Sequence, residues 1–592
     1  MSVPRTYSGL LRHYLRPQRG AVVLLAILVL GGIFLQLLNP QLIRRFLDAA
    51  EQGRSLEELL WTGGLFMFIA LVGQGLRVAG AYVGENVAWR ATNALRADLA
   101  LHCLRLDMSF HKRRRPGELI ERMDGDVNLL ANFFSQLFVE LTSNLILVSG
   151  VVVLLWLLDW RIGLSMLVVL LAGLLVLRYF NRLVVPRWQK VREVEANLFG
   201  YVEEWLDGTE ALQTSRGAPY VLERLATLSR SRWRANVSAG RANMGVMALP
   251  VALPGFAYFV AYFWGDRLFR GDVLTIGALY LVFYYINLII GPLWAVQRQV
   301  QDLQRASASL NRVLSLFGEQ PALDESGSAA LPDGPLAVRF DGVSFHYDDD
   351  PPEALVLRDV DFSLAPGRVL GLLGRTGSGK TTLIRLLVRF YDPIAGKICV
   401  GRDGSGDGDR GMIDVREVAP AALRAQVGMV TQEVQLFHAT LRDNLTLFDD
   451  SVDDARLVAA LEALGLRPWL DSLPAGLDTP LEAGESLSAG EAQLLALARV
   501  FLADAGLVIL DEASSRLDPA TERLLERALD RLLEGRTTII IAHRLATIQR
   551  ADEIMILEDG RVIEHGERAA LAADPESRFA HLLRVGLEEA LA

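Results

Sequence analysis

The segment Gly374-Arg375-Thr376-Gly377-Ser378-Gly379-Lys380-Thr381 fits the pattern G-x-x-x-x-G-K-[ST] of a phosphate-binding loop. It follows an apolar run, Val369–Leu373, that is typical of a buried strand, and it opens the helical run Thr382–Arg389. Glycines let backbone N–H groups surround phosphates, and a helix N-terminus adds positive potential. We expect Lys380 to neutralise the β- and γ-phosphates and Thr381 to hold Mg²⁺. The sequence therefore predicts an α/β nucleotide-binding domain around this loop.

Two later apolar runs also end in polar side chains. Leu507–Leu510 is followed by Asp511 and Glu512, and Thr538–Ala542 is followed by His543. Because open α/β sheets bind ligands at the carboxyl ends of their strands, we expect Asp511 to reach Mg²⁺ and Glu512 to polarise a water for attack on the γ-phosphate. His543 taken alone would fit a structural core histidine better than a catalytic one, but beside the other two motifs it is predicted to act at the site.

The composition of the whole chain points to two unlike parts. Of 592 residues, 51% are hydrophobic and 22% are charged, and the mean hydropathy is positive, which is unusual for a soluble enzyme. The abundance of apolar residues excludes disorder, and two distant cysteines, Cys103 and Cys399, exclude a disulfide scaffold. A net charge of −10 gives no basic surface for nucleic acid.

Six apolar runs in the first half are candidate membrane spans, since a span takes about 20 apolar residues. The alternative, buried helices of a soluble core, is disfavoured by the number of such runs. Arginines and lysines between the second and third and between the fourth and fifth runs place those loops and both termini in the cytoplasm. The runs are Ala21–Leu38, Leu59–Leu76, Leu137–Leu158, Ile162–Leu177, Met244–Phe263 and Val273–Val296.

The two basic loops, Val83–Ala131 and Phe180–Asn243, are long and poor in turn residues, so we expect helices that continue beyond the bilayer. Each has one predicted break, at Arg115-Pro116-Gly117 and near Gly208 or Gly217. Two independent helical hairpins remain an alternative. We divide the chain into a transmembrane domain (residues 1–318), a Pro- and Gly-rich linker (319–335) and the nucleotide-binding domain (336–592).

Taken together, these motifs resemble those of an ABC exporter half-transporter over essentially the whole chain. The resemblance implies a multidomain membrane protein, with an all-α six-helix transmembrane domain fused to an α/β P-loop ABC ATPase domain that hydrolyses ATP with Mg²⁺. It also implies roles for residues that spacing alone would not assign. Tyr347 would stack on adenine, Gln432 would sense Mg²⁺ and the attacking water, and Asp518 would lie in the D-loop. The breaks near Pro116-Gly117 and between Gly208 and Ala218 resemble coupling helices.

The predicted site thus comprises three sets of residues. The catalytic set is Glu512, His543 and Gln432, and the metal-binding set is Thr381, Gln432 and Asp511. The nucleotide-binding set is Tyr347, Gly374, Arg375, Thr376, Gly377, Ser378, Gly379, Lys380, Thr381, Thr382, Ser488, Gly490, Glu491 and Asp518.

The resemblance also implies a dimer. In the family, two ATPase domains close head to tail, so each ATP lies between the phosphate loop of one chain and the signature loop of another.

The signature loop departs from the family pattern. Where the family has Leu-Ser-Gly-Gly-Gln, this chain has Leu487-Ser488-Ala489-Gly490-Glu491. A carboxylate at Glu491 near a polyanion would cost a few kcal/mol at an effective dielectric of about 20. We therefore expect a heterodimer, in which a second half-transporter supplies the standard signature opposite Lys380, Glu512 and His543. The alternative is a homodimer that tolerates the variant signature.

The sequence leaves the transported substrate open among hydrophobic or amphipathic compounds, peptides and lipids. A homodimeric lipid or drug flippase and an ATP-gated regulatory or channel-like protein remain alternative functions. Arg77 and Glu140, at the edges of apolar runs, would contact either substrate or the membrane surface. The Asp/Gly-rich segment Gly401–Gly411 is interpreted as a hairpin tip rather than a calcium loop. The composition suggests a bacterial inner membrane, with the lipid bilayer as a partner.

Overall fold

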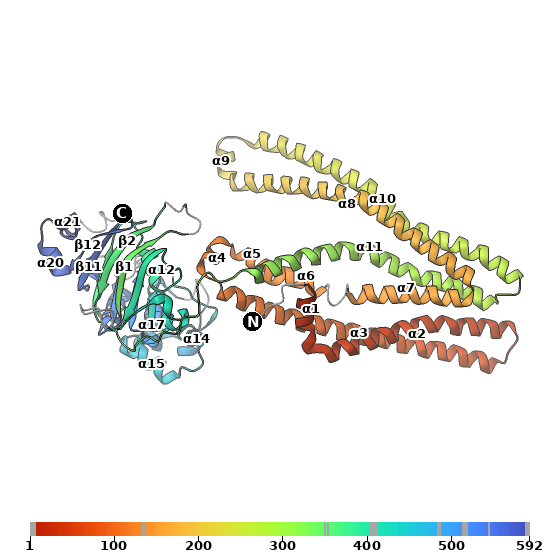
Figure 1. Ribbon diagram of the computed structural model, residues 1–592, viewed down its shortest axis with the longest axis horizontal. Helices are drawn as coiled ribbons and strands as arrows, with labels where there is room; N and C mark the ends of the chain where they lie inside the picture. Colours follow the sequence, from red (N-terminus) through yellow and green to blue (C-terminus); the bar gives the residue numbers. More distant parts are fainter. Residues whose placement is uncertain are drawn as a thin grey trace. The chain divides into compact units, whose positions relative to one another are not determined.

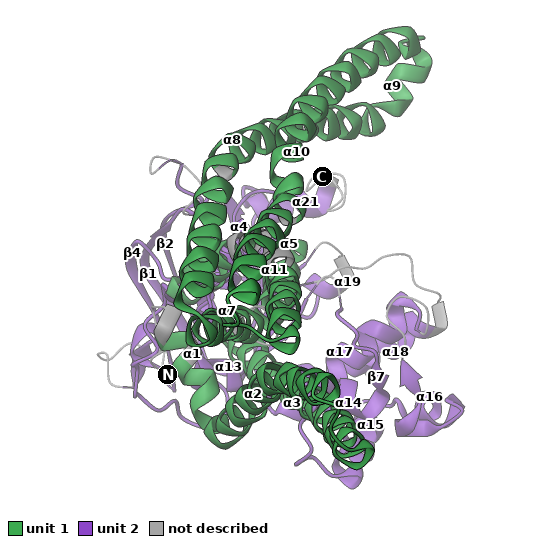
Figure 2. Cartoon of the chain, turned by 90° about the vertical axis from the view of Figure 1, so that its right-hand side faces the viewer, with its two compact units in different colours: residues 1–104, 116–319 green, residues 105–115, 320–592 purple. Residues whose placement is uncertain are grey.

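The computed structural model describes residues 7–132, 138–347, 351, 354–402, 411–431, 434–481, 487–511, 519–542 and 545–585. The chain divides into two compact units, which Figure 2 colours separately. The first unit contains residues 1–104 and 116–319, and the second contains residues 105–115 and 320–592. The short helix α4 (Met108–Arg113) therefore belongs to the second unit, although in the sequence it is flanked on both sides by residues of the first.

The first unit is entirely helical in its described residues. Figure 1 shows α2 beside α3, and α8 beside α10, as long pairs. Between α5 and α6, residues Glu121–Asp126 form a π-helical turn. The helices are α1 (Tyr7–Leu15), α2 (Arg19–Glu51), α3 (Leu56–Arg105), α5 (Pro116–Ile120), α6 (Val127–Asn132), α7 (Phe138–Leu158), α8 (Trp160–Asp207), α9 (Thr209–Thr214), α10 (Ala218–Arg270) and α11 (Ile276–Gly318).

Five of the described helices are long and apolar enough to cross a membrane, and α11 begins with a shorter apolar stretch, Ile276–Pro292. At 1.5 Å per residue, α8 and α10 are about 70–80 Å long, more than twice the thickness of a hydrocarbon core. Both helices therefore continue well beyond a bilayer, as the charged loop between the fourth and fifth apolar runs predicts. The second extension ends in α9, which is bounded by Gly208 and Gly217.

The prediction of a single break in the first extension was wrong. The chain leaves α3 at Arg105, forms α4, and only then reaches Pro116 at the start of α5. The physical reason is a helix cap: Asp107 adopts an extended conformation, and its carboxylate accepts a hydrogen bond from the N–H of Phe110 at 3.1 Å. A second oxygen of Asp107 accepts from the N–H of Ala322 at 2.7 Å, within the second unit.

A close contact joins the ends of α2 and α11. Asp48 of α2 accepts a hydrogen bond from the N–H of Gly277 at 3.0 Å, in the first turn of α11. A methyl group on Gly277 would meet the Asp48 carboxylate at 2.5 Å and the carbonyl oxygen of Arg44 at a still shorter distance. This approach of two helices therefore requires a glycine.

We expect Gly277→Ala to destabilise the first unit by about 1–3 kcal/mol, because the added carbon overpacks this contact. The loss should appear as a lower unfolding temperature of the detergent-purified protein. Gly291→Ala is the control, since a methyl group added at this position of the same helix would meet no atom within 4 Å beyond the backbone of its own helix. Equal unfolding temperatures for the two variants would contradict the assigned contact.

The second unit contains two main sheets. The strands β2-β1-β4-β5 form an antiparallel sheet, and β12-β11-β3-β10-β9-β6 form a larger one in which β11, β3, β10, β9 and β6 are parallel. The strands are β1 (Ala337–Phe345), β2 (Leu357–Leu364), β3 (Val369–Leu373), β4 (Ala395–Gly401), β5 (Met412–Asp414), β6 (Val427–Val430), β7 (Ala439–Thr440), β8 (Pro480–Leu481), β9 (Leu507–Asp511), β10 (Thr537–Ile541), β11 (Glu553–Glu558) and β12 (Arg561–Glu567).

The parallel strands are buried on both faces. Along β10, Ile539 and Ile541 belong to a core shared with the antiparallel sheet and α12, whereas Ile540 belongs to a second core built from helices such as α17 and α18. This alternation is what a strand with period two requires. The helices are α12 (Lys380–Leu387), α13 (Pro420–Ala425), α14 (Leu441–Thr446), α15 (Asp454–Ala463), α16 (Arg467–Ser472), α17 (Ala489–Ala503), α18 (Pro519–Leu533), α19 (Leu545–Ile548), α20 (Arg568–Ala573) and α21 (Arg578–Val585).

Candidate nucleotide site

The phosphate loop connects β3 to α12. Gly374 and Gly379 have φ angles of +149° and +106°, and a methyl group on Gly379 would approach the side chain of Leu357 to 2.7 Å. Glycine is the residue that reaches these angles without strain. The turn therefore brings its backbone and the first residue of α12, Lys380, to the end of a buried strand. Arg375, Thr376 and Gly377 form the exposed crest of the loop.

The loop encloses one cation and one unsatisfied hydroxyl. Lys380 is buried, and its Nζ donates hydrogen bonds to the carbonyl oxygens of Gly374 at 2.5 Å and Arg375 at 2.9 Å. Burial lowers the pKa of Lys380, and the negative charge of Asp511 partly offsets that effect. Ser378 Oγ is buried without a hydrogen-bond partner among the described residues. A buried cation beside an unpaired hydroxyl fits a phosphate group, which would supply acceptors to both.

The order of the strands gathers the other predicted residues at one edge of the sheet. Ile541 at the end of β10 pairs with Leu372 of β3 on one side and with Asp511 of β9 on the other. Val430, at the end of β6, pairs with Leu510. The carboxyl ends of these strands, and with them the phosphate loop and Asp511, therefore share an edge.

Several predicted residues follow these strands but lie outside the described part of the chain. Gln432 comes two residues after β6, Glu512 directly after β9, and His543 two residues after β10. Asp518 of the D-loop also lies outside it. The roles of these residues stay predictions.

Tyr347 lies two residues after β1 and is held beside α12. Its hydroxyl is 3.0 Å from Thr382 Oγ1 and accepts a hydrogen bond from Arg385 at 3.2 Å. The amine of Lys112, on α4, lies 4.4 Å from the centre of the Tyr347 ring, so one face of the ring contacts a cation. The structure thus brings Tyr347 and Thr382 together and leaves Thr381 exposed in the first turn of the same helix. The role of Thr381 as a Mg²⁺ ligand stays a prediction.

The signature residues form a second cluster, at the N-terminus of α17. Ser488 caps this helix, and Glu491 completes a capping box: its Oε2 accepts hydrogen bonds from the N–H and the hydroxyl of Ser488, both at 2.8 Å. Glu491 Oε1 accepts a hydrogen bond from the indole Nε1 of Trp469 at 3.1 Å. Gly490 is buried in the first turn of the same helix.

Sequence reasoning missed both features of this cluster. The pattern Ser488-x-x-Glu491 matches a capping box and could have been recognised. Nothing in the pattern points to Trp469, which is 22 residues away and belongs to another helix, α16.

Comparison with known proteins agrees with this architecture. Residues 22–293 match the model of the ABC transporter transmembrane region, and residues 357–515 match the ABC transporter model. An ATP-dependent lipid A-core flippase of Burkholderia orbicola is 32% identical over 99% of this chain and 97% of its own length. The uncharacterized ABC transporter ATP-binding protein YknV of Bacillus subtilis is 29% identical over 95% of this chain and 92% of its own.

The fold has a counterpart among solved structures. A bacterial Atm1-family ABC exporter with ATP bound superimposes with a TM-score of 0.75 at 25% identity, covering 96% of this chain and 98% of the other. The predicted family and fold class are confirmed: a helical transmembrane domain is fused to an ABC ATPase domain. This chain, a multi-pass membrane protein that couples ATP hydrolysis in a cytoplasmic domain to transport, belongs to the ABC exporters.

Proposed function

We propose that this chain exports or flips a hydrophobic or amphipathic compound, driven by ATP and Mg²⁺. The observation that carries the proposal is a pocket of about 560 Å³ in the first unit, between α2, α3 and α7. A pocket of this size suits a ligand of several hundred daltons. Its walls are mostly apolar, as expected for a guest taken from the bilayer.

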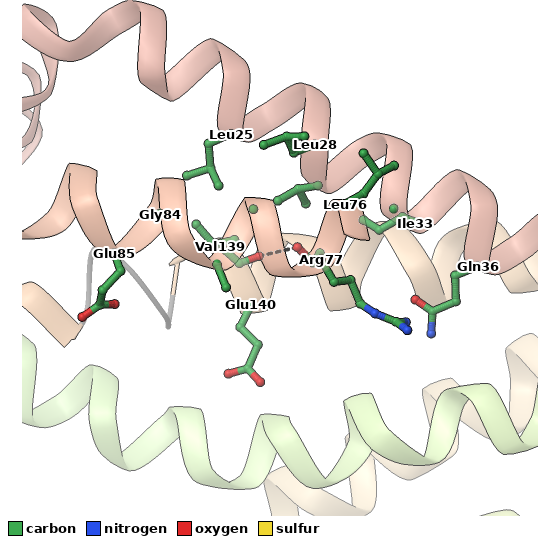
Figure 3. Close-up of a pocket in the computed structure, with 15 residues that line it drawn as sticks. Leu25, Leu28, Ile33, Gln36, Leu76, Arg77, Gly84, Glu85, Val139 and Glu140 are labelled. Carbon is green, nitrogen blue, oxygen red and sulfur yellow. Dashed lines mark hydrogen bonds between the residues drawn. The ribbon is translucent and has the colours of Figure 1, made fainter. Parts of the chain in front are cut away.

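Charged groups lie along the same pocket. Arg77, Glu85 and Glu140 line it together with leucines 25, 28 and 76. Figure 3 shows the leucine side chains between the helices and the charged heads of Arg77 and Glu140 extending away from them. Two hydrogen bonds to Gln74, at 3.1 and 2.5 Å, orient the Arg77 guanidinium. An apolar wall with charges at its border fits an amphipathic ligand.

The positions of Arg77 and Glu140 in their apolar runs indicate where the pocket lies across the bilayer. Arg77 directly follows the apolar run Leu59–Leu76, and Glu140 lies in the first turn of α7. Both positions are at the cytoplasmic ends of their apolar runs, because the single basic loop Val83–Ala131 lies between those two runs in the sequence. An amphipathic ligand would match this arrangement if its polar headgroup lay beside Arg77 and Glu140, near the inner membrane surface, and its apolar tail lay among the leucines.

Transport assays with Arg77→Gln and Glu140→Gln test the proposal. In proteoliposomes supplied with ATP, we expect at least one variant to raise the half-saturating concentration of a fluorescent amphipathic dye or labelled phospholipid about tenfold, because a charge-assisted contact is worth about 1.5–3 kcal/mol. Glu57→Gln, an exposed acid at the other end of α3, is the control. Wild-type half-saturation for both pocket variants would contradict the proposal.

In the nucleotide site, Lys380 and Ser378 would hold phosphate oxygens, Tyr347 would stack on adenine, and Thr381 and Asp511 would hold Mg²⁺. When bound, Mg²⁺ neutralises charge on the phosphates. Glu512, His543 and Gln432 keep their predicted catalytic roles, and Ser488 and Gly490 would contact the γ-phosphate of an ATP held by the opposite chain. A bacterial inner membrane is the proposed location, in keeping with the bacterial relatives.

We further propose a heterodimer, because the signature carries Glu491 where the family has glutamine. A second half-transporter would provide the standard signature. The second candidate is a homodimeric lipid flippase; the name of the Burkholderia relative, a lipid A-core flippase, favours a lipid as the substrate. The two are separated by purifying this chain alone: a homodimer with full substrate-stimulated ATPase activity would overturn the heterodimer.

A further inference from the structure

Three donor groups from two residues surround the Glu491 carboxylate. The Ser488 N–H and hydroxyl bond to Oε2, and the Trp469 indole N–H bonds to Oε1. Ser488 Oγ in turn accepts the N–H of Glu491 at 3.3 Å. A serine hydroxyl has a single proton, and here that proton is donated to Glu491. The same proton is what Ser488 would need to donate to a phosphate oxygen.

The third donor comes from a rigid part of the domain. Trp469 is 8% exposed, and its ring is packed in the core that contains α17. Its indole N–H therefore has a fixed direction. The N–H finds its hydrogen-bond acceptor only when the Glu491 carboxylate faces it. A glutamine at position 491 has one acceptor oxygen and one donor nitrogen. It could accept from either Ser488 or the Trp469 indole N–H through its oxygen, but its amide nitrogen would face the other donor. The indole N–H thus matches a carboxylate better than an amide.

We propose that Trp469 is a positioning residue of the nucleotide site: through Glu491, it keeps the Ser488 hydroxyl turned into the cap of α17 and away from nucleotide. The inference rests on the proposed function, in which Ser488 contacts the γ-phosphate. ATP binding at this signature then has to break a charge-assisted hydrogen bond before the serine can turn. We call the chain of hydrogen bonds from Trp469 through Glu491 to Ser488 the latch. In this proposal, the variant signature weakens ATP binding through the latch as well as through the negative charge of Glu491.

The latch is tested in the assembled full-length transporter in lipid nanodiscs, in which this chain is paired with its second half-transporter or, if it forms a homodimer, with its own copy. The measurement is the ATP concentration that gives half-maximal hydrolysis. We expect Glu491→Gln to lower that concentration about three- to tenfold, because it weakens the bond to the hydroxyl and removes a negative charge. Trp469→Phe keeps the packed ring but removes the N–H, and should lower it about two- to threefold. Trp469→Phe should have no further effect in the Glu491→Gln background, since Trp469 acts through Glu491.

A matched control is available. Trp264 of α10 donates its indole N–H to Ser165 Oγ of α8 at 3.0 Å, in the first unit and away from the pocket, so Trp264→Phe removes one indole hydrogen bond elsewhere. We expect it to leave the half-maximal ATP concentration unchanged. Effects of Trp469→Phe and Glu491→Gln that simply add, or an unchanged concentration in either single variant, would overturn the latch.

Failure of the latch is distinguishable from failure of the proposed function. If wild-type protein hydrolyses ATP and transports an amphipathic compound while the variants show no coupling, the latch alone is wrong. If the assembled wild-type transporter, with its second half-transporter where the chain does not form a homodimer, does neither, the proposed function is wrong. The unfolding temperature of Trp469→Phe separates a positioning effect from a loss of packing. Lost packing would lower both the unfolding temperature and kcat, whereas a positioning effect would leave the unfolding temperature unchanged.

Discussion

Replacing Lys380 with methionine should reduce ATP hydrolysis by at least about a hundredfold, the usual cost of removing one strong donor from a charged reacting centre. Methionine keeps the length of the side chain but not its charge. In the structure, the amine is held by two carbonyl oxygens of its own loop, beside the unpaired hydroxyl of Ser378. We expect an arriving phosphate to take over both groups. The measurement is phosphate release by purified protein with saturating MgATP.

The matched control is Lys397→Met, the same substitution at an exposed lysine of β4 in the same unit. It should leave the rate within about twofold of the wild type. A second measurement distinguishes lost nucleotide binding from misfolding. Saturating MgATP should raise the unfolding temperature of the wild type and of Lys397→Met, and should raise that of Lys380→Met much less. Normal hydrolysis by the Lys380 variant would contradict the assigned site.

The parts of the site that are contiguous in sequence could be predicted closely. The run Val369–Leu373 became β3 with the expected bounds, and the run before His543 became β10 (Thr537–Ile541), because buried parallel strands are short apolar runs bounded by turn residues. The phosphate loop is equally local, since its glycines, its lysine and the start of its helix are successive residues.

Contacts between distant segments could not be predicted. Trp469 meets Glu491, Lys112 meets Tyr347, and Asp126 meets Arg312, and each pair joins separate helices or loops. No periodicity records which side chains a tertiary fold brings together. The break before α4 was missed for a different reason: it is made by an aspartate cap at Asp107, without the glycine or proline that usually marks a break.

Asp126 and Arg312 give the second large prediction. Asp126 ends the π-helical turn and is 1% exposed, and Arg312 lies near the end of α11. The guanidinium makes a two-pronged contact with the carboxylate: Nε donates to Oδ2 at 2.8 Å, Nη2 donates to Oδ1, and Nη2 also donates to Ser309 at 3.1 Å. The hydrogen bond to Asp126 raises the pKa of Arg312.

Arg312→Ala should destabilise the first unit by about 3–5 kcal/mol, because it leaves a buried carboxylate without its counter-charge. The measurement is the unfolding temperature and the protease resistance of the detergent-purified chain. Arg270→Ala is the control, since Arg270 pairs with Asp266 at 2.7 Å in a contact that is largely exposed, and such pairs are worth about 0–1 kcal/mol. Adding Asp126→Asn to Arg312→Ala should recover part of the loss, because the double variant no longer buries an unpaired charge. If Arg312→Ala costs no more than Arg270→Ala, or if Asp126→Asn makes it worse, the burial of Asp126 does not determine the strength of this contact.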